Sequence, residues 1–243
     1  CLTSPMDPNS LEYLAMLRLF TDVAKRCPGQ VIPDDYLVID TETTGVDTSK
    51  DHILQLGFCF VHGRKPIASM AQYLKRPDLK IHKKASEVNG ITLDKIEAEG
   101  IEPKYYIPQV VDIFTDWRSR GRMFAGHNLM AFDAPLIERE TAGVGIPFKF
   151  GDNEIIDTGM LVKAAQLGMY MRPDETLRSF WVRVSQVIAK GIFWSLARHC
   201  YTAYNLGKYG LPLDKAHDAE ADCRLSHFLL EELRLMVAKE AIK

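Results

Sequence analysis

The spacing of apolar residues along the chain predicts a helix followed by a group of strands. Residues 9–26 carry leucine, phenylalanine and valine at steps of three, which is the period of one helix face. After the breaker at residues 27–29 come short runs rich in strand-forming residues, at 36–40, 53–64 and 65–74. A glycine-containing turn separates the last two runs, so we expect a hairpin that continues from the first strand as an antiparallel meander.

The second half of the chain predicts a crossover and then mostly helices. Residues 105–120 have helical spacing, and residues 122–128 read as a strand that enters a helix at 129–140. A strand that returns after a helix is expected to pair in parallel with the first strand. Three further stretches, which Pro173 and Gly191 interrupt, are predicted to be mostly helical: residues 155–168, 177–201 and about 218–239. The chain is therefore predicted to be one α/β domain with a mixed sheet flanked by helices.

We place the domain boundary at the breaker that precedes the first strand. Residues 1–33 are predicted to be an accessory N-terminal helix, and residues 34–243 the main domain. The opening CLTSP, before Met6, lacks the basic start and apolar stretch of a secretory signal, so we interpret it as a remnant of recombinant expression. A helical insertion is expected around residues 171–195, and its tryptophans are interpreted as core rather than as a partner-binding surface.

Composition indicates an ordinary globular protein but does not indicate which ligand it binds. Apolar residues make up 47% and charged residues 26% of the chain, as in ordinary globular domains, and the net charge is -2. Any affinity for nucleic acid must therefore come from local charge or bound metal. The longest near-apolar run, residues 53–61, is much shorter than the roughly 18 residues of a membrane span. Five cysteines without CxxC spacing argue against a disulfide framework and predict a reducing, intracellular (cytoplasmic) setting.

The first candidate chemistry lies at the end of the first predicted strand. Asp40 and Glu42 are two residues apart, and the period of a strand directs both side chains to one face. In α/β sheets, ligands bind beyond the carboxyl ends of strands, which is where this pair lies. Acids are also common at solvated strand ends, so the pair alone does not decide between function and a solvated surface.

Two further groups supply acids from later in the chain. Asp133 follows a predicted strand-to-helix turn in GHNLMAFD, where a solvent-facing helical aspartate is the plain alternative. HDAEAD opens the final predicted helix, with His217 at its entrance and Asp222 about one turn inside. Asp218 is a candidate helix cap, but a cap does not explain the histidine and the second acid.

Four carboxylates at one site would need neutralisation. Two like charges 4 Å apart repel by about 4 kcal/mol at an effective dielectric constant of about 20. Two divalent cations would cancel the four charges, and hard oxygen ligands favour Mg²⁺ or Mn²⁺. A pair of cations suits in-line displacement at a phosphodiester. The imidazole of His217, with an ordinary pKa near 6.5, can accept a proton from the attacking water at neutral pH.

These three motifs, in this order, resemble those of the DEDDh or DnaQ-like 3'-to-5' exonucleases, which include the proofreading epsilon subunit, ribonuclease T and oligoribonuclease. DTETTG (40–45), GHNLMAFD (126–133) and HDAEAD (217–222) match the motifs, and the resemblance spans roughly residues 34–238. It implies a ribonuclease H-like fold with a mixed five-stranded sheet. It also implies that Asp40 bridges two cations, that Glu42 and Asp222 bind the cation that activates water, and that Asp133 binds the other.

The resemblance further implies a substrate site beside the acids. The backbone around Thr43, Thr44 and Gly45 is expected near the terminal nucleotide, and Asn128 is expected to support Asp133 or the substrate. Residues 85–96 are similar to a family segment that often has a histidine where this chain has Asn89.

The leading hypothesis from the sequence is a metal-dependent 3'-to-5' exonuclease. It would release nucleoside 5'-monophosphates from 3' ends of single-stranded or frayed nucleic acid, with DNA favoured over RNA. One alternative is a 3'-to-5' exoribonuclease on short or single-stranded RNA, because the motifs do not reveal whether a 2'-hydroxyl is accepted. Another is a non-catalytic subunit that binds 3' ends or a polymerase. A polymerase or other replication protein is left open as a partner.

Overall fold

The computed structural model describes residues 33–187, apart from positions 168, 170 and 173, together with residue 196 and residues 217–241. Its centre is a five-stranded sheet with the order β3-β2-β1-β4-β5. The strands are β1 (Tyr36–Thr43), β2 (Ile53–His62), β3 (Lys65–Tyr73), β4 (Met123–Gly126) and β5 (Ile155–Asp157). β1, β2 and β3 pair antiparallel, whereas β4 pairs in parallel with both β1 and β5. The predicted meander, the parallel crossover and the mixed five-stranded sheet are confirmed.

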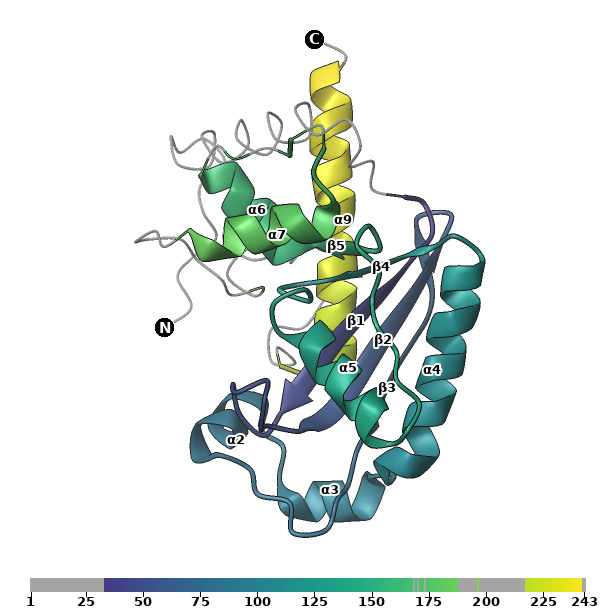
Figure 1. Cartoon of the computed structure of the whole chain (residues 1–243), viewed down its shortest axis with the longest axis vertical. Coiled ribbons are helices and arrows are strands. Elements are labelled where there is room, and N and C mark those ends of the chain that lie inside the picture. Colours follow the sequence, from purple (N-terminus) through teal and green to yellow (C-terminus); the bar gives the residue numbers. More distant parts are fainter. Residues whose placement is uncertain are drawn as a thin grey trace.

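Helices cover both faces of this sheet (Figure 1). They are α2 (Lys83–Asn89), α3 (Leu93–Glu99), α4 (Pro103–Ser119), α5 (Asp133–Gly143), α6 (Thr158–Gln166), α7 (Leu177–Gln186) and α9 (Ala219–Ala241). In this view α5 crosses in front of the strands and the long α9 passes behind them, while α6 and α7 lie beside α9 near β5. α2 and α3 form a separate arm below the carboxyl end of β1.

Two predictions about the second half of the chain were wrong in detail. Residues 155–157 form the edge strand β5 instead of the start of a helix, and only residues 158–166 of that stretch are helical. The helix predicted at 129–140 begins at Asp133, four residues late, because residues 127–132 form an irregular loop. The predicted helix at 9–26 and most of residues 188–201 fall outside the described residues, so the domain boundary at 33/34 stays a prediction.

The main core lies between the sheet and the α4–α5 layer. Leu37, Ile39 and Phe58 point from β1 and β2 toward α4, where Phe114 is fully buried. The ring of Phe114 meets that of Phe58 edge-on at 5.7 Å between centroids. Aromatic pairs in this geometry add to the stabilisation that burial of their area provides. The alternating inward residues of β1 therefore anchor the strand that carries the first two acids.

A smaller core joins α6 and α7 to the end of β5. Phe180 and Trp181 are buried with Met160, and the indole N–H of Trp181 donates to the backbone carbonyl of Ile155 at 3.0 Å. This confirms the interpretation of Trp181 as core; Trp194 lies outside the described residues. Among the helices that the structure describes, none combines the length and the hydropathy that crossing a bilayer needs.

The beginning of α9 packs directly against β2. A Cβ atom added to Gly57 would lie 2.5 Å from the backbone carbon of Ala219, so glycine is required for this approach. Two residues away, the side chain of Gln55 accepts from the N–H of Ala219 at 3.0 Å and donates to Asp218 at 3.2 Å. Gly57 is the cross-strand partner of Asp40, and Gln55 is the partner of Glu42. The N-terminal start of α9 is thus fixed on the face of the sheet that Asp40 and Glu42 share.

Replacing Gly57 with alanine tests this docking. We expect Gly57→Ala to reduce the free energy of unfolding by about 1 to 3 kcal/mol, as overpacking does in well-packed cores. Thermal unfolding followed by circular dichroism measures the change. Gly143→Ala is the matched control, because a Cβ there meets nothing within 4 Å and the residue ends helix α5. Equal melting temperatures for Gly57→Ala and the wild type would contradict the close approach of α9.

Candidate active site

The first two acids lie at the carboxyl end of β1, as predicted. Glu42 is 9% exposed and Asp40 is partly exposed. The register between β1 and β2 shifts between Glu42 and Thr43, which ends regular pairing immediately after the second acid. Irregularities of this kind redirect side chains at the ends of strands. The shift separates the acids from the loop that follows them.

Asp133 is the first residue of α5 and approaches β1 from the other helix layer. Its side chain is only 3% exposed and accepts a hydrogen bond from the hydroxyl of Thr41 at 2.5 Å. The first turn of a helix has free N–H groups and favours negative charge, which suits a buried carboxylate there. The alternative of a solvent-facing aspartate was therefore wrong. Thr41 lies between Asp40 and Glu42, so this contact brings the second motif to the first.

The third motif reaches the same place through the start of α9. The Asp218 side chain accepts from the N–H of Ala221 at 3.1 Å, which confirms the capping role considered for it. His217 has a left-handed backbone with φ of 69°, and its N–H donates to Asp222 at 3.2 Å. Ligand atoms of Glu42, His217 and Asp222 all lie within 4.8 Å of one another. Residues from opposite ends of the domain thus meet at one point.

The carboxylates perturb one another strongly. Burial, followed by the charges of Asp222, Asp133 and Glu42, raises the pKa of Asp40 well above its ordinary value. Burial, followed by the charges of Asp222 and Asp133, raises the pKa of Glu42 to about 9, and burial raises the pKa of both Asp133 and Asp222 to about 7. Each of these shifts disfavours the charged form. The four acids cannot all ionise near neutral pH unless positive charge joins them.

Divalent cations fit this donor set. Buried carboxylate oxygens with a nearby imidazole suit hard or borderline cations, and no cysteine thiol belongs to the cluster in the described part of the chain. A cation would remove the repulsion that raises the carboxyl pKa values. The residues that could hold it are Asp40, Glu42, Asp133 and Asp222, with His217 at the margin. His217 is open to solvent on one side, and its partial burial lowers the pKa of its ring.

The loop after the acids is held by its own hydrogen bonds. The Thr43 hydroxyl donates to the carbonyl of Gly45 at 2.6 Å, and the Thr44 hydroxyl donates to Asp51 at 2.8 Å. A Cβ on Gly45 would lie 2.4 Å from the Asp51 carboxylate, so glycine is needed for this packing. The structure therefore places Thr43, Thr44 and Gly45 in a rigid loop beside Glu42. Contact between this loop and a nucleotide stays a prediction.

Two residues that sequence reasoning did not select support this region. Gln55 fixes the start of α9 from the position opposite Glu42. Asn89, noted only as a departure from the family pattern, donates to the carbonyl of Thr43 at 3.4 Å, and its amide favours the charged form of the nearby Glu42 carboxyl. Its amide oxygen accepts from the N–H of Ile91 at 3.0 Å. The α2–α3 arm is thereby bonded to the strand end that follows Glu42.

Asn128 lies in the loop before Asp133, with a positive φ of 59°. Its N–H donates to the buried carboxylate of Asp157 at 3.0 Å. Asp157, also missed from the sequence, ends β5; an acid directly after the apolar pair Ile155–Ile156 was the available signal. His127, which precedes Asn128 in the chain, is a buried core histidine whose ring nitrogen lies 2.9 Å from the Thr158 hydroxyl.

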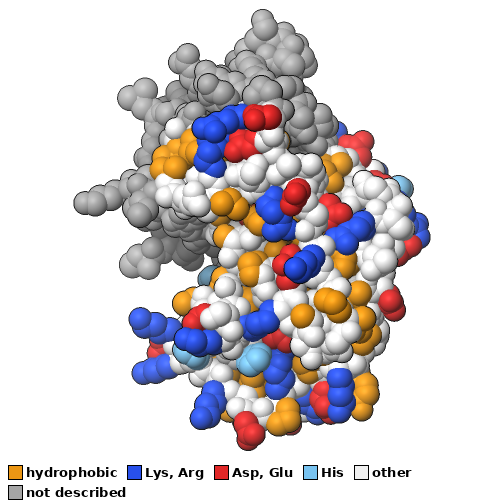
Figure 2. Space-filling view, viewed as in Figure 1, with side chains coloured by type: hydrophobic (Ala, Val, Ile, Leu, Met, Phe, Trp, Pro, Cys, Tyr) orange, Lys and Arg blue, Asp and Glu red, His pale blue; other side chains and the backbone are white. Residues whose placement is uncertain are grey.

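Basic side chains on this side of the molecule are interspersed with acids rather than gathered in one patch (Figure 2). Arg76 is 13% exposed and pairs with Glu140 at 2.8 Å. Arg118 pairs with Glu154 at 2.7 Å. These two arginines serve the fold.

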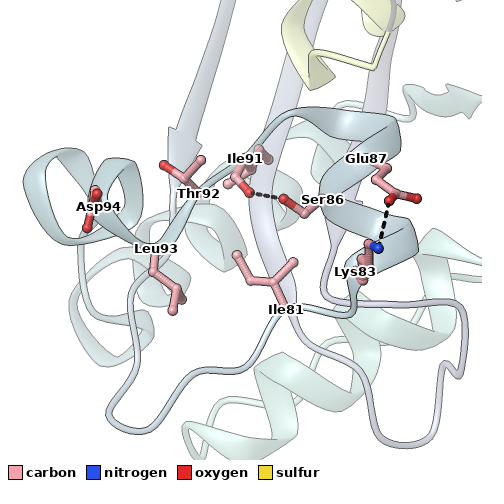
Figure 3. A pocket seen from close by; sticks show the side chains of 8 residues that line it. All are labelled: Ile81, Lys83, Ser86, Glu87, Ile91, Thr92, Leu93 and Asp94. Atoms are coloured by element: carbon pink, nitrogen blue, oxygen red, sulfur yellow. Dashed lines mark hydrogen bonds and ion pairs between the residues drawn. The ribbon is translucent and has the colours of Figure 1, made fainter.

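A cavity of about 480 Å³ lies in the α2–α3 arm (Figure 3). Figure 3 shows Ile81, Ile91 and Leu93 around it, with the Lys83–Glu87 ion pair on α2 at one side. None of the four acids or His217 lines the cavity. It is therefore separate from the acidic cluster, although Asn89 bonds to one of its lining residues.

Comparison with known families now bears on this cluster. The model for the RNase T exonuclease domain matches residues 37–187, which is more than half of the chain. The chain belongs to the RNase T exonuclease family. This confirms the resemblance to DnaQ-like exonucleases, a family of nucleases that hydrolyse phosphodiesters. The matched range contains Asp40, Glu42 and Asp133, whereas His217 and Asp222 follow it in sequence and join them through α9.

Two curated relatives of this exonuclease domain are bacterial polymerase components. It is 26% identical over 209 residues to the DNA polymerase III subunit epsilon of Treponema pallidum, which covers 85% of this chain and 78% of that protein. It is also 26% identical over 130 residues to the PolC-type DNA polymerase III of Ureaplasma parvum, covering 53% of this chain but 8% of that protein.

Solved structures agree with the fold of the exonuclease domain. An E. coli exonuclease I complex with single-stranded DNA, in a zinc-bound form, has a TM-score of 0.63 at 18% identity and covers 83% of this chain and 40% of its own. A complex of the same enzyme with a dA16 oligonucleotide has a TM-score of 0.64 at 17% identity and covers 85% of this chain and 42% of its own. The chain thus spans about two fifths of exonuclease I, and the ribonuclease H-like architecture is confirmed.

The raised carboxyl pKa values predict how metal and pH affect stability. A carboxyl whose pKa is higher in the folded state stabilises the protein when protonated, and this contribution is lost as the pH rises from about 4 through the folded pKa values. In the metal-free protein these carboxyl groups should therefore lower the free energy of unfolding progressively between about pH 5 and about pH 9. A divalent cation at about 100 times its Kd adds about 2.7 kcal/mol, and we expect its effect to be larger at high pH.

Thermal unfolding with Mn²⁺ or with chelator, at about pH 5.5 and about pH 8.5, measures this difference. Asp40→Asn is the control, because it removes one of the repelling charges and should reduce both the pH dependence and the effect of Mn²⁺. A Mn²⁺-induced rise in melting temperature that is equal at both pH values would contradict the electrostatic account.

Proposed function

We propose that this chain is a metal-dependent 3'-to-5' exonuclease that removes nucleoside 5'-monophosphates from single-stranded or frayed DNA ends. The observation that carries the proposal is the convergence of Glu42, His217 and Asp222, with ligand atoms within 4.8 Å of one another, beside Asp40 and Asp133. Acids held together against their mutual repulsion are consistent with a centre that binds cations. Membership of the exonuclease family gives the reaction class.

Asp40, Glu42, Asp133 and Asp222 would hold two divalent cations, Mg²⁺ or Mn²⁺. Such ions, when bound, stabilise the charge on the attacking and leaving oxygens of a phosphodiester during in-line displacement. Thr41 and the first turn of α5 keep Asp133 in place, and the N–H of His217 does the same for Asp222. The nearby Asn89 amide favours the charged form of Glu42. The protein thereby fixes Asp133 and Asp222 before substrate arrives.

His217 would act as the general base. Partial burial lowers the pKa of its ring, so the imidazole is neutral at physiological pH and can accept a proton. Its position at the entrance of α9 places the ring beside Glu42 and Asp222, where the attacking water would lie. The neutral ring also adds no charge to the cluster until it takes the proton.

The choice of DNA rests on the relatives. The exonuclease I structures are complexes with DNA oligonucleotides, and the epsilon subunit belongs to a DNA polymerase. The loop of Thr43, Thr44 and Gly45 would contact the terminal nucleotide, because its rigid backbone adjoins Glu42. A polymerase is a candidate partner on the same ground.

A degradation assay tests the reaction and the substrate together. End-labelled DNA and RNA oligonucleotides, single- and double-stranded, are incubated with Mg²⁺, Mn²⁺ or chelator. We expect shortening of 5'-labelled single-stranded DNA one nucleotide at a time, and no reaction with chelator. Asp40→Asn should abolish turnover while remaining folded, and Asp116→Asn, an exposed acid on α4, should match the wild type. Faster loss of RNA would reverse the substrate choice, and no degradation of any strand would favour a non-catalytic 3'-end-binding subunit.

His217→Ala tests the general base. We expect the rate to fall by about 100- to 10,000-fold, the usual contribution of such a group. Added imidazole should restore part of this loss, because it supplies the missing proton acceptor, but should not restore Asp222→Asn. His62→Ala, which changes an exposed histidine at the far end of β2, is the control. Full activity in His217→Ala would overturn the assignment.

A further inference from the structure

The carboxylate of Asp157 is fully buried and binds backbone groups of two different segments. It accepts from the N–H of Met160 at 2.9 Å, in the first turn of α6. It also accepts from the N–H of Asn128 at 3.0 Å and of Met130 at 2.9 Å, in the loop between β4 and α5. The side chain is 0% exposed. Asp157 therefore joins two segments that are about 30 residues apart in sequence.

Capping of α6 explains only half of these contacts. A helix cap needs one oxygen that accepts from the first turn, which Oδ1 of Asp157 provides to Met160. The second oxygen, Oδ2, accepts from Met130 and contributes nothing to the helix. A serine or asparagine would cap α6 as well. Capping of α6 therefore does not explain why this residue has a second carboxylate oxygen, which binds Met130.

The loop that Asp157 holds leads directly into Asp133. The carbonyl of Asn128 accepts from the N–H groups of Ala131 and Phe132, and the carbonyl of Leu129 accepts from Ala134 at 2.8 Å. These bonds form a continuous turn from Asn128, with its positive φ, to the first residues of α5. Asp157 therefore anchors the start of the turn that carries the backbone of Asp133. The side chain of Asp133 is held separately, by the hydroxyl of Thr41.

The packing around this anchor is tight. A Cβ on Gly159 would lie 2.2 Å from the Oδ1 atom of Asn128, and the Thr158 hydroxyl donates to the carbonyl of Gly126 at 3.1 Å. Residues 157–159 and 126–130 are therefore packed closely against each other. A change at Asp157 would be transmitted to Asp133 rather than absorbed in the loop.

We propose that Asp157 is a positioning residue: by binding the N–H groups of Asn128 and Met130 it fixes the loop that presents Asp133 to the acidic cluster. This inference rests on the proposed function of that cluster as a cation-dependent centre. Outer partners of metal ligands typically change metal affinity or activity by 10- to 100-fold when they are removed. Asp157 does not contact Asp133 by a hydrogen bond; it acts through the backbone of the loop that carries Asp133.

Asp157→Asn is the main test variant. Its amide oxygen can still cap α6 and accept from Asn128, but its NH₂ group would face the N–H of Met130, donor against donor. Asp157→Ser keeps a capping hydroxyl that is too short to bridge to Met130. Two controls separate a positioning role from a structural one: Val110→Ala creates a cavity in the α4 core, and Asp116→Asn removes an exposed carboxylate.

Mn²⁺ binding to each substrate-free protein is measured by calorimetry, and the Mn²⁺ dependence of strand degradation by rate assays. We expect both Asp157 variants to bind Mn²⁺ about 10- to 100-fold more weakly, and to recover much of their rate at high Mn²⁺. Val110→Ala should melt at lower temperature yet bind Mn²⁺ as the wild type does. Wild-type Mn²⁺ affinity in Asp157→Asn would overturn the inference.

The two proposals fail in different ways. If the wild type binds Mn²⁺ but degrades no strand, the proposed function fails, and the calorimetric comparison still decides the role of Asp157. If the wild type degrades DNA and the Asp157 variants differ from it no more than Val110→Ala does, the positioning role fails and the proposed function stands.

Discussion

The candidate site depends on the contact between the start of α9 and strand β2. Gly57 allows the helix backbone to approach, and Gln55 binds its first N–H and its capping acid. These two residues are the cross-strand partners of Asp40 and Glu42, so one register fixes both the acids of β1 and the helix that brings His217 and Asp222. A shift of the register by one residue would turn the acids away from α9.

Electrostatic repulsion explains why so many groups are devoted to holding the acids. Buried carboxylates that raise one another's pKa would separate if their elements were free to move. Two of them are instead tied by hydrogen bonds, Asp133 to the Thr41 hydroxyl and Asp222 to the N–H of His217, while the Asn89 amide lies near Glu42 and favours its charged form. The bonds use backbone groups and neutral side chains, so none of them cancels the charge. The cluster remains available to a cation.

Much of this arrangement could be predicted from the sequence, and the exceptions have physical reasons. Runs of strand-forming residues between turn signals revealed β1, β2 and β3, and ordered motifs pointed to the acids on β1, α5 and α9. Strand β5 has three residues, too few to show a period, and was read as part of the following helix. The same error concealed Asp157, whose partners are backbone N–H groups that carry no sequence signal. Gln55 was hidden likewise, because its importance comes from cross-strand register with Glu42.

Strand β1 also serves two opposite layers within three residues. Asp40 and Glu42 face the side on which α9 packs, whereas Thr41 between them binds the acid at the start of α5. The centre is therefore complete only when both helix layers have docked on the same strand. With only one of the two layers packed on β1 the candidate ligands would be an incomplete set, so the site is a property of the whole domain and of no single layer.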